Sequence, residues 1–174
     1  ISGNDGRGIS STSSQIILTS SVIKNNNKAN LYSYNSTINI NNSLFIDTLG
    51  VSNIQTHTDD IINITYSTFV QTGLQDEANL DISSSNVNII NSIIWSNDSL
   101  RQPINLDADS ISITYSNILG GWSGIGNVTG DPAFVSDTDF HLTELSPGVD
   151  RASPESSTAF DLEGNARPSS GESL

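Results

Sequence analysis

The sequence contains no cysteine and no methionine, and only 6 of its 174 residues are lysine or arginine. Without cysteine the chain cannot form disulfides, use thiolate chemistry or bind a metal through sulfur. The 19 acidic residues give a net charge of −13, which opposes binding to phosphate backbones and to anionic lipid. The composition therefore predicts neither a nucleic-acid partner nor a membrane-surface partner.

Long apolar stretches are also missing, because no segment approaches the roughly 20 residues that a membrane span needs. The chain begins at Ile1 with neither an initiator methionine nor a signal-peptide pattern. We therefore expect a processed or incomplete chain, with further coils or another subunit covering its N-terminal face. The lack of cysteine fits an exported protein, although cytosolic proteins can lack it too.

Small polar residues dominate what is present. The chain has 30 serines, 20 asparagines and 14 threonines, together with 22 isoleucines, and only 14% of its residues are charged. Low charge combined with many β-branched residues argues against disorder. The length suits one domain of ordinary size with a buried core.

A sequence repeat recurs every 22 to 25 residues. It begins with two aliphatic columns spaced two residues apart; these are Ile16, Ile38, Ile62, Val87 and Ile111, then Leu18, Ile40, Ile64, Ile89 and Ile113. A serine column and a further apolar column follow; these are Ser21, Ser43, Ser67, Ser92 and Ser116, then Ile23, Phe45, Phe69, Ile94 and Ile118. A weaker apolar column precedes each block by seven or eight residues; it is Ile9, Leu31, Ile54, Leu80 and Ile104.

Spacing of two residues places side chains on one face of a strand, and the β-branched bias agrees. A leucine-rich repeat has a similar period, but it requires a leucine-dominated consensus with a buried asparagine and usually a helical segment. We therefore predict an all-β fold, a right-handed parallel β-helix of about five coils, with two short strands in each repeat. The serines are expected at a bend, as a stacked polar ladder rather than as nucleophiles.

The repeat stops near Gly120, where the composition shifts to glycine, proline and acidic residues. We expect coils over residues 1–119 and an irregular C-terminal cap, packed on the last coil, over 120–174. The motifs of this tail are GNVTGDPAFV at 126–135, DFHL at 139–142, SPGVD at 146–150 and DLEGNARP at 161–168. In this order they resemble the C-terminal cap of secreted bacterial right-handed parallel β-helix proteins of the pectate-lyase-like superfamily.

That resemblance implies two kinds of catalytic site. The related lyases use carboxylates that hold Ca²⁺ together with an arginine or lysine base, and the related hydrolases use several aspartates on adjacent coils. Asp59 and Asp60, beside His57, are the best candidates here, and Arg101 is the base within the later coils. Asp109 shares a column with Asp60 but lies two coils away. We therefore predict no catalytic site, with Asp59, Asp60 and Arg101 in one groove as the alternative.

The sequence also predicts no metal or other cofactor. Loose Ca²⁺ binding by Asp131, Asp137 and Asp139 is the alternative, although their spacing matches neither an EF-hand nor a glycine-aspartate repeat. His141 is expected to be packed or hydrogen-bonded rather than a ligand. Tyr66 and Tyr115 share a column and are expected to point outward, where they could stack on sugars.

Several short motifs permit glycosylation. N-glycosylation sequons begin at Asn35, Asn41, Asn63, Asn97 and Asn127. Three Asp-Ser/Thr-aliphatic motifs resemble an O-glycosylation signal of some bacteria, with Thr48, Ser99 and Ser110 as acceptors. Both patterns arise easily by chance in a chain so rich in these residues.

Taken together, these features predict a non-catalytic extracellular or cell-surface β-solenoid. It would be a structural, adhesin-like or fibre-forming module, glycosylated and associating with itself or with an extracellular polysaccharide. The alternative is a fragment of a polysaccharide lyase or glycoside hydrolase of the pectate-lyase-like superfamily.

Overall fold

The computed structural model describes residues 1–73, 77–83, 86–97, 103–153 and 158–167, which form strands and loops and contain no helix. The strands are β1 (Ile9–Thr12), β2 (Gln15–Thr19), β3 (Val22–Lys24), β4 (Leu31–Tyr34), β5 (Thr37–Asn41), β6 (Leu44–Asp47), β7 (Ile54–His57), β8 (Ile61–Thr65), β9 (Thr68–Gln71), β10 (Leu80–Ser83), β11 (Asn86–Ile90), β12 (Ile93–Ser96), β13 (Ile104–Asp107), β14 (Ser110–Thr114) and β15 (Asn117–Ile118).

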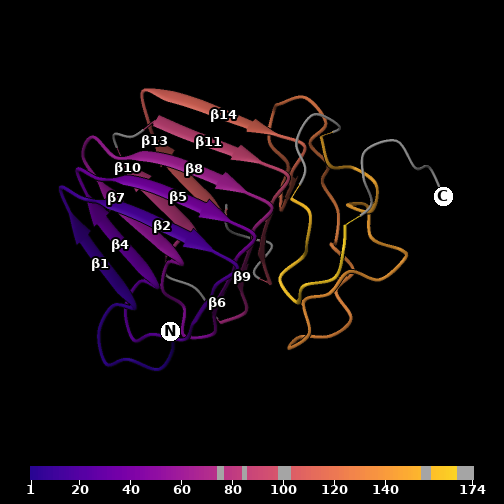
Figure 1. Ribbon diagram of the computed structural model, residues 1–174, viewed down its shortest axis with the longest axis horizontal. Helices are drawn as coiled ribbons and strands as arrows, with labels where there is room; N and C mark the ends of the chain where they lie inside the picture. The colour runs from indigo at the N-terminus through magenta and orange to yellow at the C-terminus, as the bar shows by residue number, and fades with distance from the viewer. Residues whose placement is uncertain (74–76, 84–85, 98–102, 154–157, 168–174) are drawn as a thin grey trace.

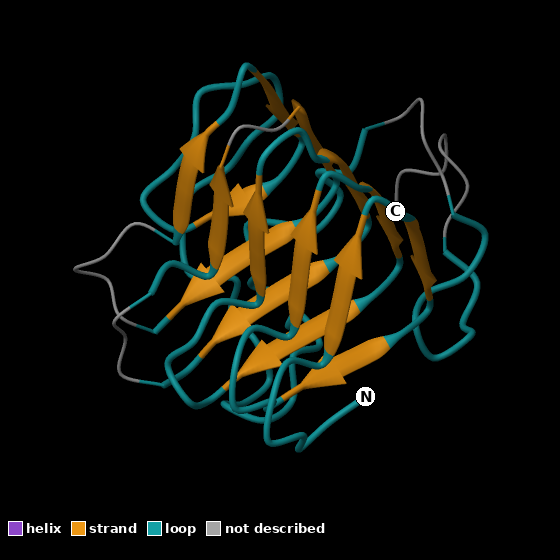
Figure 2. Cartoon of the chain, turned by 90° about the vertical axis from the view of Figure 1, so that its left-hand side faces the viewer, coloured by secondary structure: helices purple, strands orange, loops and turns teal. Residues whose placement is uncertain are grey.

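Strands three apart in the chain pair in parallel and build three sheets of five strands each (Figure 1). We call these the first sheet (β1-β4-β7-β10-β13), the second sheet (β2-β5-β8-β11-β14) and the third sheet (β3-β6-β9-β12-β15). Figure 2 shows how the strands of successive turns stack in rows. The fold is thus an all-β parallel solenoid, as the sequence predicts.

Two details of the prediction are wrong. The solenoid makes about four turns rather than five coils, because five stacked strands are separated by four complete turns. Each turn also carries three strands rather than two. The repeated segment around each serine bends at the serine and divides into two strands, such as β2 and β3. The right-handed sense of the coil stays a prediction.

The aliphatic columns stack in the expected register. Ile38 pairs with Ile62, and Ile62 pairs with Val87, with no slippage along the second sheet. Period-two spacing points these side chains inward, and Ile62 and Ile64 are fully buried. Phe45 and Phe69 stack in the third sheet with ring centroids 4.8 Å apart. One continuous apolar core therefore runs through the solenoid.

The serine column forms the corner between the second and third sheets. The hydroxyl of Ser67 donates to the carbonyl of Thr65 at 2.8 Å and accepts the backbone N–H of Ser43 at 3.1 Å. Ser43, Ser92 and Ser116 accept in the same way from the preceding turn. The last N–H of the column, that of Ser116, is bound by the side chain of Asn127 at 2.9 Å. The predicted polar ladder is confirmed, and we call it the serine ladder.

The described part of the C-terminal segment, residues 120–153 and 158–167, lies beside the third sheet (Figure 1). Val128 forms a parallel bridge with Asn117 of β15, Ser153 donates to Asn91, and the guanidinium of Arg167 donates to Asn42. The segment therefore contacts β15 and the corners that follow β5 and β11. The division of the chain into domains at residues 119 and 120 stays a prediction. Over the described residues, no helix is long and apolar enough to cross a membrane.

Candidate functional site

A cleft of about 840 Å³ lies between the outer face of the third sheet and the C-terminal segment. We call it the flank cleft. Leu44, Thr68 and Ile93 project outward from β6, β9 and β12, where they alternate with inward core residues. A sheet face with apolar side chains is costly in water, and the C-terminal segment covers part of it. What remains is a concave surface with an apolar floor and a polar rim, the usual form of a ligand site.

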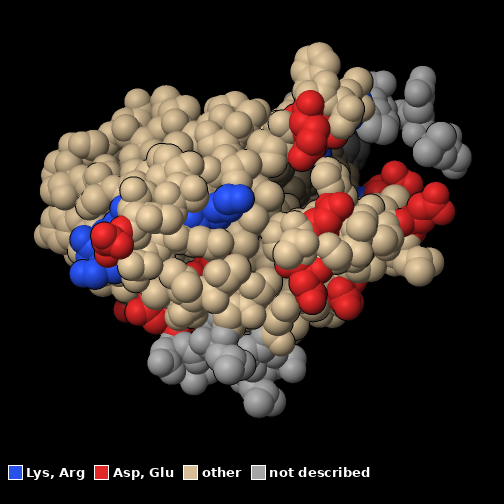
Figure 3. All heavy atoms as spheres, turned by 90° about the horizontal axis from the view of Figure 1, so that it is seen from below, with Lys and Arg blue, Asp and Glu red and all other residues tan. Residues whose placement is uncertain are grey.

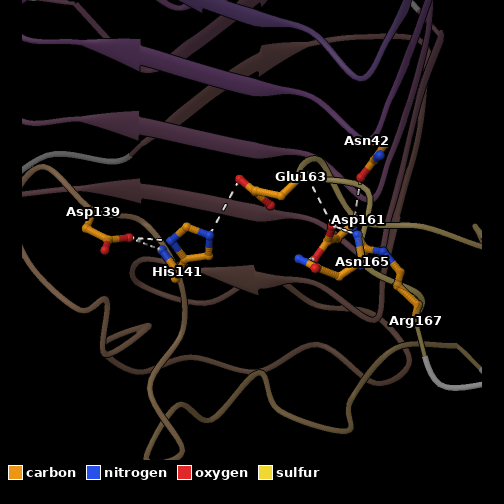
Figure 4. A network of polar contacts seen from close by, with 7 residues as sticks. All are labelled: Asn42, Asp139, His141, Asp161, Glu163, Asn165 and Arg167. Atoms are coloured by element: carbon orange, nitrogen blue, oxygen red, sulfur yellow. Dashed lines mark hydrogen bonds and ion pairs between the residues drawn. The ribbon is translucent and has the colours of Figure 1, made fainter.

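His141 lies on the rim of the flank cleft between two carboxylates (Figure 4). Its Nδ1 bonds to a carboxylate oxygen of Asp139, and its Nε2 lies 3.5 Å from Oε1 of Glu163. The hydrogen bond to Asp139 raises the pKa of His141, and the same bond lowers the pKa of Asp139. The imidazole therefore joins the loop around residues 139–141 to the loop around 161–165, and the expectation of a hydrogen-bonded histidine is confirmed.

Asp161 organises the second of these loops. It accepts both the backbone N–H and the side-chain amide of Asn165, at 2.7 and 2.9 Å, and the N–H of Glu163 at 3.1 Å. The hydrogen bond from the side-chain amide of Asn165 lowers the pKa of Asp161, and the hydrogen bonds from backbone N–H groups lower it further. The carboxylates of the rim thus have partners within the segment.

Arg167 closes the opposite side of the rim. Its guanidinium donates to Oδ1 of Asn42 at 2.9 Å and lies 5.0 Å from the ring centroid of Tyr66, within the range of a cation–π contact. Tyr66 and Tyr115 both line the cleft, so the structure brings the two predicted tyrosines together on one surface. Tyr115 also packs closely on Gly126, where a side chain would collide with its ring.

The alternative catalytic residues lie elsewhere. Asp60 is fully buried at the corner before β8, where it accepts the N–H of Ser36 at 2.6 Å and the hydroxyl of Ser33 at 3.0 Å. Burial raises the pKa of this carboxyl. Asp59 is exposed at the same corner with φ 51°, and Arg101 lies outside the described residues. Asp60 therefore belongs to a buried hydrogen-bonded group with Ser33 and Ser36, at the corner between the first and second sheets, and does not face a surface groove.

The aspartates considered for Ca²⁺ binding make local turns. Asp131 accepts the N–H of Ala133 at 2.8 Å, Asp139 bonds to His141, and Asp137 is exposed. Across the part of the chain that the structure describes, no group of three or more acidic or histidine side chains could hold a metal ion. Asp131, Asp137 and Asp139 therefore do not come together as a Ca²⁺ site.

The predicted N-glycosylation residues have different environments. Asn35 and Asn97 are exposed at turns, whereas Asn41 and Asn63 are half-buried on the second sheet and bond to neighbouring turns. Asn127 uses its amide inside the fold, donating to the carbonyls of Ile113 and Trp122. Exposure makes Asn35 and Asn97 the sequons best placed for modification.

Of the predicted O-glycosylation acceptors, Thr48 and Ser110 are exposed. The hydroxyl of Thr48 donates to Asn25 at 3.2 Å. Ser99 lies outside the described residues. Modification of all these positions stays a prediction.

Sequence reasoning missed a second ladder. The side-chain amide of Asn30 donates to Asn53 at 2.6 Å, and that of Asn53 donates to Asn79 at 2.8 Å. All three are buried, and each also donates to a backbone carbonyl of the third sheet. The signal was present, because each asparagine directly precedes a residue of the weaker apolar column. We call Asn30, Asn53 and Asn79 the asparagine ladder.

Comparison with known proteins finds no matching family model, no similar curated protein and no similar solved structure. The resemblance of the tail motifs to the pectate-lyase-like superfamily is therefore not supported. The stacked parallel sheets and the two ladders place the chain, by fold alone, among the parallel β-solenoids.

Proposed function

We propose that this chain is a non-catalytic structural or adhesin-like module that acts outside the cell or at its surface. The observation that supports the proposal is that the repeated polar side chains are hydrogen-bonded inside the solenoid. The serine ladder, the asparagine ladder and Asp60 are hydrogen-bonded to backbone groups or to each other within the solenoid. Residues committed in this way stiffen the turns and are not presented to a substrate.

The partners proposed for this module are extracellular glycans and further copies of the chain. The flank cleft supports the first, since concave sites with tyrosine and polar groups are suited to sugars. The edge strands β1, β2, β13 and β14 support the second, because strand edges pair readily with other chains and would permit end-to-end fibres. Glycosylation at the exposed Asn35 and Asn97 would fit the same setting.

Incubating the purified chain with neutral and acidic polysaccharides, with and without Ca²⁺, tests the proposal. We expect retention of the chain on at least one polysaccharide and no release of new reducing ends or unsaturated sugars. Turnover that disappears in Asp60→Asn would contradict the non-catalytic assignment and favour a lyase or hydrolase.

A further inference from the structure

The outward side of the second sheet carries no charged residue. Period-two alternation sends the first, third and fifth side chains of each of its strands outward. We call these residues the outward face; they are Gln15, Ile17, Thr19, Thr37, Asn39, Asn41, Ile61, Asn63, Thr65, Asn86, Asn88, Ile90, Ser110, Ser112 and Thr114. None is charged, although the chain has 19 acidic and 6 basic residues. The face therefore suits a partner without charge.

The outward face is open to solvent. None of its side chains is buried, and in Figure 1 its five strands run side by side with nothing drawn in front of them. Figure 3 shows the molecule from below, so that the front of Figure 1 forms its upper border. Acidic side chains gather over the C-terminal segment, to the right, whereas the upper border of the solenoid, to the left, is tan. An uncharged surface can therefore approach the outward face without desolvating a charge.

The side chains of the outward face form a regular grid. Its strands pair in parallel without slippage, so each outward position recurs from strand to strand at about 4.8 Å. Outward residues within one strand are about 6.6 Å apart. Hexagonal ice presents rows of water oxygens at spacings close to both. The grid thus offers hydroxyl and amide groups at the intervals of ordered water.

Several of these side chains are fixed in place before any ligand binds. The amide of Asn63 donates to Oδ1 of Asn39 at 3.0 Å, and that of Asn41 donates to Oγ1 of Thr65 at 2.7 Å. The threonines and isoleucines of the face are β-branched, which restricts their χ1 rotamers. Side chains that are already ordered lose little entropy when they meet a rigid lattice.

The size and composition of the outward face argue against other uncharged partners. Five strands of five residues span roughly 24 by 16 Å, or about 400 Å², whereas a stable protein interface takes about 800 Å² from each partner. Sugars pack on aromatic rings, and the face has none. Ice requires neither feature, because its lattice is built from the same water molecules that the face orders.

We propose that the outward face binds ice. Its hydroxyl and amide groups hold a layer of water that joins the crystal lattice, and its exposed isoleucines, Ile17 and Ile61, pack against that layer. The bound chain then hinders growth of the crystal at that point. This activity goes beyond the proposed function and does not depend on it.

Partition into ice tests the proposal. A crystal that grows slowly from a solution of the full chain excludes ordinary solutes, and a globular carrier protein serves as the excluded reference. We expect the chain to enter the ice and to slow the recrystallisation of small ice crystals. Exclusion of the chain from ice would overturn the proposal, as would retention on crystalline cellulose or chitin without entry into ice.

A charge placed on the grid locates the binding. Asn88 is exposed in the middle of β11, and Asn88→Lys should lose about half or more of the ice-bound fraction, because the lattice contact must desolvate the ammonium group. Gln55→Lys, the same change on the outward side of β7 in the first sheet, should bind ice like the unmodified chain. Ser112→Lys, exposed on β14, replaces Asn88→Lys if that variant does not fold. Undiminished ice binding by the folded variant, or equal losses in Gln55→Lys, would contradict the site.

Sedimentation of the same proteins distinguishes ice from a second copy as the occupant. We expect the unmodified chain and Asn88→Lys to have the same oligomeric state, since the face is too small for a stable protein interface. An oligomer that Asn88→Lys dissociates would overturn the proposal. Retention on polysaccharides is measured separately, so a failure of the proposed function and a failure of ice binding are distinguishable.

Discussion

At the scale of single residues, the fold depends on small polar side chains that replace backbone partners at the corners. The residue before each ladder serine has a positive φ, between 46° and 52°, and Tyr66 and Tyr115 adopt it although this region favours glycine or asparagine. A backbone conformation of this kind costs about 1–3 kcal/mol. The serine hydroxyl that follows offsets the cost, because it binds a carbonyl of its own turn and an N–H of the preceding one.

Ser67→Ala tests this role. The substitution leaves the buried N–H of Ser43 without its acceptor and removes one of the two donors to the carbonyl of Thr65, which keeps the N–H of Asn42. We therefore expect a loss of about 1–3 kcal/mol in the free energy of unfolding. Urea denaturation measures it. Ser10→Ala, at an exposed position of β1, is the control and should change stability by less than about 0.5 kcal/mol. Equal effects would show that the ladder contributes nothing specific.

Asp60 predicts a pH dependence at the neighbouring corner. Burial raises its pKa above the ordinary value, so the folded state binds this proton more tightly than the unfolded state. Its contribution to stability is therefore complete below the ordinary pKa and is lost as the pH rises through the raised pKa. Asp60→Asn has no such titration.

The free energy of unfolding of Asp60→Asn, minus that of the unmodified chain, should accordingly increase as the pH rises from about 3 to neutrality. Chemical denaturation at several pH values measures this difference. Asp59→Asn, at the exposed neighbour, controls for the loss of one charge. A difference that stays flat, or that decreases with pH, would show that burial does not govern Asp60.

At the scale of elements, the sequence predicts the strands better than the corners. The aliphatic columns reveal the stacking for two reasons. The number of residues in one turn sets the spacing between successive members of a column, and burial requires all members to lie on the inward face of their strands. The third strand of each turn was missed because β3, β6 and the strands stacked on them are short and follow the serine directly. The flank cleft could not be predicted, since contacts such as Arg167 with Asn42 join residues far apart in the chain.

The asparagine ladder shows the limit of motif reasoning at this scale. A buried asparagine was treated as a mark of leucine-rich repeats, yet this solenoid stacks three buried asparagines in one ladder. The physical requirement is general, because any turn between parallel strands leaves carbonyls that need donors. The side-chain amides of Asn30 and Asn53 meet it by donating both to a carbonyl and to the next amide, and Asn79 donates to carbonyls alone.

Asn53→Ala should destabilise the middle turns strongly. It removes the partner of Asn30, the partner of Asn79 and the donor to the carbonyl of Val70. We expect a loss of about 2–5 kcal/mol in the free energy of unfolding. Asn88→Ala, exposed on β11, is the matched control and should cost less than about 0.5 kcal/mol. Comparable losses in the two variants would argue against the ladder.

At the scale of the whole molecule, the central claim is that isoleucine-rich repeats stack turn upon turn in one fixed register. The absence of cysteine from the sequence allows a direct test with introduced pairs. Asn39 and Asn63 face each other on adjacent strands of the second sheet, with their amides 3.0 Å apart, whereas Asn88 lies one further strand away.

Oxidation of paired cysteines is the most direct measurement of this register. Adjacent parallel strands lie about 4.8 Å apart, within the range that a disulfide spans, and strands two apart are separated by about 10 Å, beyond that range. Asn39→Cys with Asn63→Cys should therefore form a disulfide in the native protein, and Asn39→Cys with Asn88→Cys should remain reduced. Failure of the first pair, or equal oxidation of both, would contradict the stacked solenoid.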